Sequence, residues 1–295
     1  MNFTEIHIQT TEKSAPAISE ELSEFGAVSV TFLDAADNPI FEPSKETTIL
    51  WKKTIVIGLF DQLMDLSPLL KKLKTQNNFE IFDIKLKNLP DEDWVKKSLD
   101  SFKPMKFGKH LWICPSWIKP PEPKDINIIL DPGQAFGTGS HPTTALCLEW
   151  LEKNVNKPIK VTDYGAGSGI LGLAALKLGA KHVTAIDIDR KSLEITTQNM
   201  LQNNIQPIEF NTFLPDNAPM EESDLVIANI LQGPLIELAP KIKKLTKPLG
   251  KIILSGILRE QVDSIRAAYK QFFCLQPVVF KEEWGLVEGI RTNNI

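Results

Sequence analysis

The stretch that most constrains the fold is residues 161–171, with the sequence VTDYGAGSGIL. Apolar and β-branched residues lead up to and surround Asp163, and glycines then stand at positions 165, 167 and 169. Because glycine has no Cβ, a ligand can rest on the backbone of such a turn, and the amides that begin a following helix can donate to it. The stretch therefore predicts a buried strand, a glycine-rich turn and a helix that together bind a nucleotide-like group.

The spacing of these glycines leaves two cofactor classes open. Asp163 followed by Gly165, Gly167 and Gly169 gives the pattern G-x-G-x-G, which suits S-adenosylmethionine. Glycines at 167, 169 and 172 also satisfy G-x-G-x-x-G, the fingerprint of a dinucleotide such as NAD. Spacing alone excludes neither cofactor, so the flanking residues have to decide between them.

Strand-like and helix-like segments alternate through the C-terminal part of the chain. The expected strands cover 160–164, 182–188, 208–213, 224–230 and 251–255, and the expected helices cover 170–178, 190–203, 235–245 and 260–272. Such alternation predicts an α/β domain with a doubly wound, Rossmann-like parallel sheet and helices on both faces. Two closing strands near 277–280 and 285–289 could form an antiparallel hairpin at the edge of this sheet.

The N-terminal segment has a different order of elements: strand, helix, strand, strand, helix, strand. These elements cover 3–10, 14–25, 27–33, 48–60, 64–73 and 79–86. The order is typical of a small α+β domain of the ferredoxin-like kind. We therefore expect a ferredoxin-like domain over residues 1–88.

A connecting segment follows this domain. It contains a short expected helix over 91–102, an aromatic strand at 110–114, and prolines at 115, 120, 121 and 123 that stiffen an extended chain. We expect a linker over 89–125 and a second domain, which carries the glycine-rich turn, over 126–295.

Composition limits the compartment and the partners. The chain has no apolar run near the ~18 residues of a membrane span, and its N-terminus lacks the basic and apolar regions of a signal peptide, so we expect a cytoplasmic protein. The net charge is −4, and residues 1–124 contain no arginine, which favours a basic partner over direct nucleic-acid binding. Three widely separated cysteines indicate neither a disulfide framework nor a metal site. Nothing in the sequence requires more than a monomer.

Ligands of open α/β sheets bind beyond the carboxyl ends of the strands, so the residues there are candidates. Asp187 follows Gly165 by 22 residues, where a carboxylate can accept both hydroxyls of a ribose. Asp189 better fits the start of the next helix. Asn229 ends an apolar strand, and its side-chain oxygen could accept from an amine while the nitrogen lone pair stays free. The alternative is that Asn229 only suits a strand-to-loop turn.

The loop over 131–144 is a further candidate. Its glycines at 133, 137 and 139 allow movement, Phe136 offers an apolar anchor, and Thr143 or Thr144 offers a hydroxyl, so the loop could close over a cofactor and exclude water. His141 precedes Pro142 and suits the start of a helix, so we assign it no chemical role.

No paired carboxylates, metal cluster or nucleophile with its base stands out, and this absence agrees with methyl transfer. A sulfonium methyl group is already activated, so an enzyme contributes mainly alignment and removal of water. The nucleophile is a neutral amine, which for lysine means loss of a proton with a reference pKa of roughly 10.4, against about 7.7–8.0 for an α-amine.

These motifs, taken together, resemble one family. The matching residues are Leu130–Gly133, Ala135–Gly139, His141–Thr144, Asp163–Gly169, Ile186–Asp189, Ala228–Leu231, Gly233–Leu235, Ser255–Ile257 and Glu282–Trp284. Over residues 128–288 the chain is similar to the ribosomal protein L-eleven methyltransferase (ribosomal protein methyltransferase A) family.

The resemblance implies a class I S-adenosylmethionine-dependent protein N-methyltransferase. The implied substrate is a large-subunit ribosomal protein, methylated on lysine ε-amines and on its N-terminal α-amine, with the small domain docking it and the linker flexing to present different amines. By position, Thr144, Gly165, Asp187 and Asn229 would contact the cofactor together with Gly167 of the turn, and Asn229 with Thr144 would orient the amine. The alternatives are an NAD(P)-dependent oxidoreductase and a non-catalytic adenosine-binding module.

Overall fold

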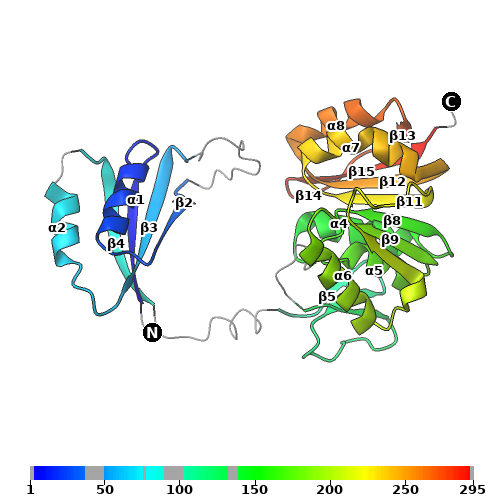
Figure 1. Cartoon of the computed structure of the whole chain (residues 1–295), viewed down its shortest axis with the longest axis horizontal. Helices are drawn as coiled ribbons and strands as arrows, with labels where there is room; N and C mark the ends of the chain where they lie inside the picture. Colours follow the sequence, from blue (N-terminus) through cyan, green and yellow to red (C-terminus); the bar gives the residue numbers. More distant parts are fainter. Residues whose placement is uncertain (1–2, 37–49, 76–77, 90–101, 132–138, 293–295) are drawn as a thin grey trace. The chain divides into compact units, whose positions relative to one another are not determined.

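The computed structural model describes residues 3–36, 50–75, 78–89, 102–131 and 139–292. The chain divides into two compact units, Met1–Lys97 and Ser98–Ile295 (Figure 1). Almost all of the expected helix over 91–102 lies outside the described residues, as do residues 132–138 of the candidate loop, Phe136 among them.

The first unit has the ferredoxin-like order that the sequence predicts. Its elements are β1 (Phe3–Thr11), α1 (Ala15–Glu24), β2 (Ser29–Asp34), β3 (Lys53–Asp61), α2 (Ser67–Thr75) and β4 (Ile81–Leu89). The sheet order is β2-β3-β1-β4, and every neighbouring pair is antiparallel. Alternate residues of β1, such as Ile6 and Ile8, are fully buried in one cluster with Ile18 of α1 and Leu69 of α2. Both helices therefore cover the same face of the sheet.

The second unit is built on the doubly wound sheet that the sequence predicts. Its strands are β8 (Lys160–Tyr164), β9 (His182–Ile186), β10 (Phe210–Phe213), β11 (Ser223–Asn229), β12 (Thr246–Leu258), β13 (Phe273–Leu275), β14 (Val279–Lys281) and β15 (Trp284–Arg291). Its helices are α4 (Pro142–Asn154), α5 (Ile170–Lys177), α6 (Arg190–Gln202), α7 (Gln232–Leu245) and α8 (Val262–Tyr269). The strand order is β10-β9-β8-β11-β12-β15-β13, and the first five strands run parallel.

Helices cover both faces of this sheet (Figure 1). The cluster on one face contains residues of α4, α5 and α6, and the cluster on the other face contains residues of α7 and α8. In β11, Leu225 and Ile227 belong to the first cluster, whereas Val226 and Ala228 belong to the second. A strand that is buried on both faces reads as a continuous apolar run, which explains the sequence before Asn229.

The closing hairpin differs from the expectation. β14 and β15 do pair antiparallel, but β15 lies inside the sheet, between β12 and β13, rather than at its edge. Its middle residues Leu286 and Val287 are 2% and 0% exposed and contribute to opposite clusters. An interior strand of this kind needs partners on both sides, and β13 supplies the outer one.

Part of the expected linker belongs to the second unit. β5 (Met105–Phe107), β6 (Leu111–Cys114) and β7 (Ile126–Ile129) form a small sheet, in which β6 pairs antiparallel with β5 and parallel with β7. Its buried side chains, among them Leu111, Ile113 and Ile128, join the cluster of α4 and α5. Asn203, 3% exposed, clamps β7 by accepting from the Ile129 amide at 2.8 Å and donating to the Ile129 carbonyl at 2.7 Å.

We expect Asn203→Ala to lower the free energy of unfolding of the second unit by roughly 2 kcal/mol, because it leaves buried backbone groups of Ile129 without partners. Denaturant titration followed by tryptophan fluorescence measures this change. Asn211→Ala is the matched control. Asn211 is exposed and its side chain contacts that of His182 at 3.0 Å, so a change within about 0.5 kcal/mol is expected. Equal losses in both variants would contradict the role of the Asn203 clamp.

Candidate functional site

The glycine-rich turn between β8 and α5 has the backbone that only glycine adopts readily. Gly165, Gly167 and Gly169 have φ of 81°, 56° and 77°. The amides of Gly165 and Ala166 donate to the carbonyl of Ile186 at 2.7 and 3.1 Å, which joins the turn to the end of β9. A Cβ at Gly169 would lie 2.7 Å from Thr196 Cγ2 of α6. Packing against α6 therefore requires Gly169, whereas Gly165 and Gly167 face the cavity described below.

Asp187 follows β9 and holds the turn. Its Oδ2 accepts from the Gly167 amide at 2.8 Å, and its Oδ1 accepts from the Asp189 amide at 2.9 Å. A carboxylate oxygen can accept more than one hydrogen bond, so these contacts leave room for the hydroxyls of a ribose. Asp189 caps α6, as the sequence predicts, with its side chain accepting from the amides of Lys191 and Ser192.

Asn229 and Thr144 meet although 85 residues separate them. The Asn229 Nδ2 donates to Thr144 Oγ1 at 3.5 Å, and Thr144 is 1% exposed in the first turn of α4. Because the amide nitrogen is turned toward Thr144, the amide oxygen is the group that can accept from an amine. Thr143, the other hydroxyl that the sequence offered, bonds instead to His141 Nδ1 at 2.7 Å.

His141 and Trp284 form an aromatic pair. His141 is the N-cap of α4, where its Nδ1 accepts from the Thr143 amide at 3.3 Å. Its ring lies edge-on to the Trp284 ring, with the centroids 4.7 Å apart and an interplanar angle of 69°. Burial lowers the pKa of His141, and the nearby Glu282 carboxylate opposes this shift, so the ring is held toward its neutral form at neutral pH.

These residues line one cavity of about 520 Å³, a volume typical of small-molecule sites. Its wall is made of His141, Thr143, Thr144, Tyr164, Gly165, Ala166, Gly167, Ile170, Leu171, Asp187, Ile188, Ser192, Asn229, Ile230, Leu231, Pro234, Leu238, Gly256 and Trp284. The structure thus brings the five predicted site residues, Thr144, Gly165, Gly167, Asp187 and Asn229, to a single cavity. The sequence had marked Trp284 only as part of a motif and gave it no role in the site.

The chemical groups that line the cavity fit an adenosine. The glycine turn exposes backbone, Asp187 offers a carboxylate to a ribose, and Ile188, 83% exposed, offers an apolar surface to a flat base. The sheet order fits a dinucleotide less well, because dinucleotide-binding sheets have the order 3-2-1-4-5-6, whereas here the antiparallel β15 stands between β12 and β13.

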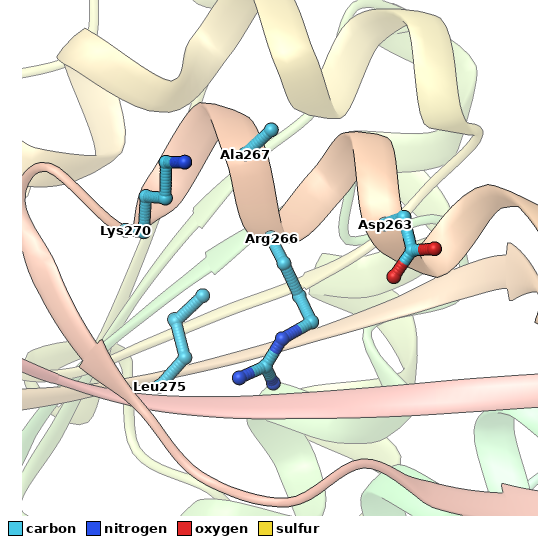
Figure 2. Close-up of a pocket in the computed structure, with 5 residues that line it drawn as sticks. All are labelled: Asp263, Arg266, Ala267, Lys270 and Leu275. Carbon is cyan, nitrogen blue, oxygen red and sulfur yellow. The ribbon is translucent and has the colours of Figure 1, made fainter.

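A second, smaller hollow lies on α8 and contains none of the predicted site residues. Figure 2 shows Arg266 extending from the helix toward the neighbouring strand, with Asp263, Ala267, Lys270 and Leu275 around it. The Arg266 Nη1 donates to the carbonyl of Gln276 at 2.9 Å. The guanidinium therefore secures the chain after β13, which is a structural role.

Asp163 lies under the turn and is fully buried. Its Oδ2 accepts from the Gly172 amide at 2.9 Å, and its Oδ1 has no hydrogen-bond partner in the described structure. Burial raises the pKa of Asp163 to about 7, with a smaller contribution from the Asp187 charge, while the Gly172 amide acts in the opposite direction. Asp163 is therefore a buried support of the turn and does not line the cavity.

Two kinds of feature are absent from the described part of the chain. No group of three or more His, Cys, Asp or Glu side chains there could hold a metal ion. None of the helices described there has both the length and the apolar character needed to span a bilayer.

The raised pKa of Asp163 makes stability depend on pH. Between its ordinary value of 3.8 and about 7, the unfolded chain has released this proton while the folded chain keeps it, so the free energy of unfolding falls as pH rises through this window and then levels off. Asp163→Asn removes the titrating group. We therefore expect the stability of Asp163→Asn relative to the native chain to increase from about pH 5 to about pH 7.5, as measured by denaturant titration. A constant difference across this range would contradict the buried, protonated state.

Comparison with known proteins agrees with this geometry. A family model described as Ribosomal protein L11 methyltransferase (PrmA) matches residues 2–292. The ribosomal protein L11 methyltransferase of Azotobacter vinelandii is 45% identical over 291 residues, covering 99% of this chain and 100% of the relative. That of Shewanella denitrificans is 46% identical over 293 residues, with the same coverage.

A solved structure extends the comparison to the fold. The crystal structure of a ribosomal protein L11 methylase from Lactobacillus delbrueckii subsp. bulgaricus superposes with a TM-score of 0.59 at 34% identity, covering 65% of this chain and 100% of that chain. The family match spans nearly the whole sequence, both units included. This chain belongs to the ribosomal protein L11 methyltransferase (PrmA) family.

Proposed function

We propose that this chain transfers methyl groups from S-adenosylmethionine to amines of ribosomal protein L11. Membership of the family supports the reaction, and the names of the full-length relatives support the substrate. The observation that carries the proposal is the single cavity in which Gly165, Gly167 and Asp187 meet Asn229 and Thr144. One group of residues suits a nucleoside, and the other suits an amine.

Gly165, Gly167 and Asp187 hold the cofactor. The cofactor supplies a methyl group that is already activated on a sulfonium. The backbone of the two glycines lies open to the cavity, and the Asp187 carboxylate, fixed by two backbone amides, accepts the ribose hydroxyls. A fixed acceptor loses little freedom on binding, which favours affinity.

Asn229 and Thr144 orient the amine. The Asn229 amide oxygen accepts an N–H of the neutral amine, so that the nitrogen lone pair points away from Asn229 and is free to attack. Thr144 fixes the amide by accepting from Nδ2 at 3.5 Å. Buried apolar residues of the same cavity, such as Ile170 and Leu171, reduce contact with water and favour the neutral form of the amine.

The first unit recognises the protein substrate. In this division, residues 1–88 dock L11 and residues 126–295 carry the chemistry; of the segment 89–125 between them, the part from β5 onward packs in the core of the second unit. Support comes from the separate buried core of the first unit and from large apolar side chains on its surface, with Leu33, Phe82 and Leu86 46%, 52% and 52% exposed. We place the enzyme in the cytoplasm, because its substrate is a ribosomal protein, and we propose a monomer, because the five predicted site residues of one chain line a single cavity.

Incubation of the purified chain with methyl-labelled S-adenosylmethionine and isolated ribosomal proteins tests the function. We expect label on L11, on lysine ε-amines and the N-terminal α-amine, with mass spectrometry giving the sites. Label on another protein would overturn the substrate. Absence of label on any protein, together with retention of NAD, would overturn the reaction.

Asp187→Ala and Asn229→Ala form a matched pair that separates cofactor binding from amine orientation. For Asp187→Ala we expect the affinity for S-adenosylhomocysteine, measured by calorimetry, to fall about tenfold to a hundredfold, because a charge-assisted pair is lost. For Asn229→Ala we expect kcat to fall by about a hundredfold with the affinity nearly unchanged, because the amine loses its alignment.

Asp187→Asn is the control for the turn, since it keeps one acceptor for a backbone amide and loses the charge. Its affinity should still fall while its thermal stability stays close to that of the native chain. Unchanged affinity in both Asp187 variants would remove the ribose assignment. A loss in Asn229→Ala confined to cofactor affinity would remove the amine assignment.

A further inference from the structure

Ser255 is a fully buried polar residue of β12 that the proposed reaction so far does not use. In the sheet it pairs with Asn229, the last residue of β11. On its other side β12 bulges, because it has two residues between Leu254 and Ile257 where β15 has one. A bulge interrupts the hydrogen-bond ladder between two strands, so the backbone groups beside it need other partners.

The Ser255 hydroxyl holds this bulge to β15. It donates to the Gly285 carbonyl at 3.0 Å, so this carbonyl has a hydrogen-bond partner beside the interrupted ladder. The next residue of the bulge, Gly256, has a φ of 83°, and a Cβ there would lie 2.4 Å from the Ile230 carbonyl oxygen. The bulge therefore packs directly against the backbone that follows Asn229.

The same hydroxyl contacts α4, the helix that carries Thr144. Cys147 lies three residues after Thr144, is fully buried and forms a hydrogen bond with the Ser255 side chain. Burial raises the pKa of the Cys147 thiol, so the thiol keeps its proton. Because the Ser255 proton is donated to the Gly285 carbonyl, the Ser255 oxygen accepts from the Cys147 thiol. One hydroxyl thus joins α4, β12 and β15.

The contact between Asn229 and Thr144 depends on how α4 is held against the sheet. Asn229 Nδ2 and Thr144 Oγ1 are 3.5 Å apart, which exceeds the usual length of about 2.7–3.2 Å for an N–H···O bond. A small further displacement would break this contact and release the orientation of the Asn229 amide. Ser255 connects the two elements concerned, since it neighbours Asn229 in the sheet and contacts α4 one turn after Thr144.

We infer that Ser255 is a positioning residue for the methyl transfer: by tying α4 to the bulge of β12, its hydroxyl holds Thr144 and Asn229 at the separation that orients the amine. The inference rests on the proposed function. Ser255 does not line the cavity, so it acts on the reaction through Asn229 and Thr144 and not by contact with the amine or the cofactor.

Steady-state kinetics with ribosomal protein L11 compare Ser255→Ala with a matched control, Ser223→Ala. Ser223 is 4% exposed at the other end of β11, where its hydroxyl bonds to that of Thr162 at 2.8 Å. For Ser255→Ala we expect kcat to fall about tenfold, with the affinity for S-adenosylhomocysteine within about twofold of the native value, because only the alignment of the amine is lost. Ser223→Ala also loses a buried hydroxyl of this sheet, but its kcat should stay within about twofold.

A double-mutant cycle tests whether Ser255 acts through Asn229. In the Asn229→Ala background, adding Ser255→Ala should lower kcat by less than about twofold, because the residue that it positions has already been removed. A further loss of about tenfold in this background would show that the two residues act independently, and it would overturn the positioning role.

Ser255→Cys keeps the inference testable if Ser255→Ala does not fold. It nearly preserves the volume of the side chain and replaces the hydroxyl by a weaker donor. We expect its kcat to fall about threefold, and calorimetry with S-adenosylhomocysteine checks that it is folded. If Ser255→Ala binds no S-adenosylhomocysteine, Ser255→Cys takes its place in the comparison with Ser223→Ala and in the cycle with Asn229→Ala.

The outcomes separate the two proposals. If the native chain labels no protein, the proposed function fails. If the native chain labels L11 but the folded Ser255 variants keep the native kcat, or Ser223→Ala loses as much kcat as they do, the function stands and the role of Ser255 is wrong.

Discussion

The hydrogen bond from the Gly167 amide to the Asp187 carboxylate joins the two strand ends on which the cavity depends. Without it, the glycine turn after β8 and the residues after β9 would be connected mainly through the Ile186 carbonyl. The same carboxylate also receives the Asp189 amide, and Asp189 in turn caps α6. One side chain thus sets the path of two loops and the start of a helix. Its suitability for a ribose follows from that fixed position.

Residues beneath the glycine turn support this connection between the two strand ends. Asp163 accepts from the Gly172 amide in the first turn of α5, and the glycine at 169 lets α6 approach through Thr196. A buried carboxyl with one oxygen lacking a hydrogen-bond partner is costly, unless the group is protonated. The turn is thus held by one carboxyl group in the cavity wall and another in the core.

Local sequence patterns predicted the elements and several of the residues that line the cavity. The alternation in β1 reflects burial on one face of its sheet, and the continuous apolar run before Asn229 reflects burial on both faces. Both patterns can be read directly from the sequence. The position of β15 could not be read in this way, because the place of a strand in a sheet depends on distant partners. For the same reason, the segment that contains Leu111 and Ile113 resembled a spacer, although α4 and α5 bury it. Trp284 was noted as part of a motif, but its place in the cavity wall depends on contacts such as that with His141, which lies 143 residues earlier in the chain.

The direction of β15 determines which loops can alter the wall of the cavity. The five parallel strands present their last residues at the cavity edge of the sheet, whereas the antiparallel β15 presents its first residue, Trp284, and the hairpin turn before it. The cavity wall therefore combines the carboxyl ends of parallel strands with the amino end of one antiparallel strand, and different loops connect them. Substitutions or insertions in the turn at Glu282 and Glu283 would change the wall at Trp284 while the ends of β8, β9 and β11 stay as they are.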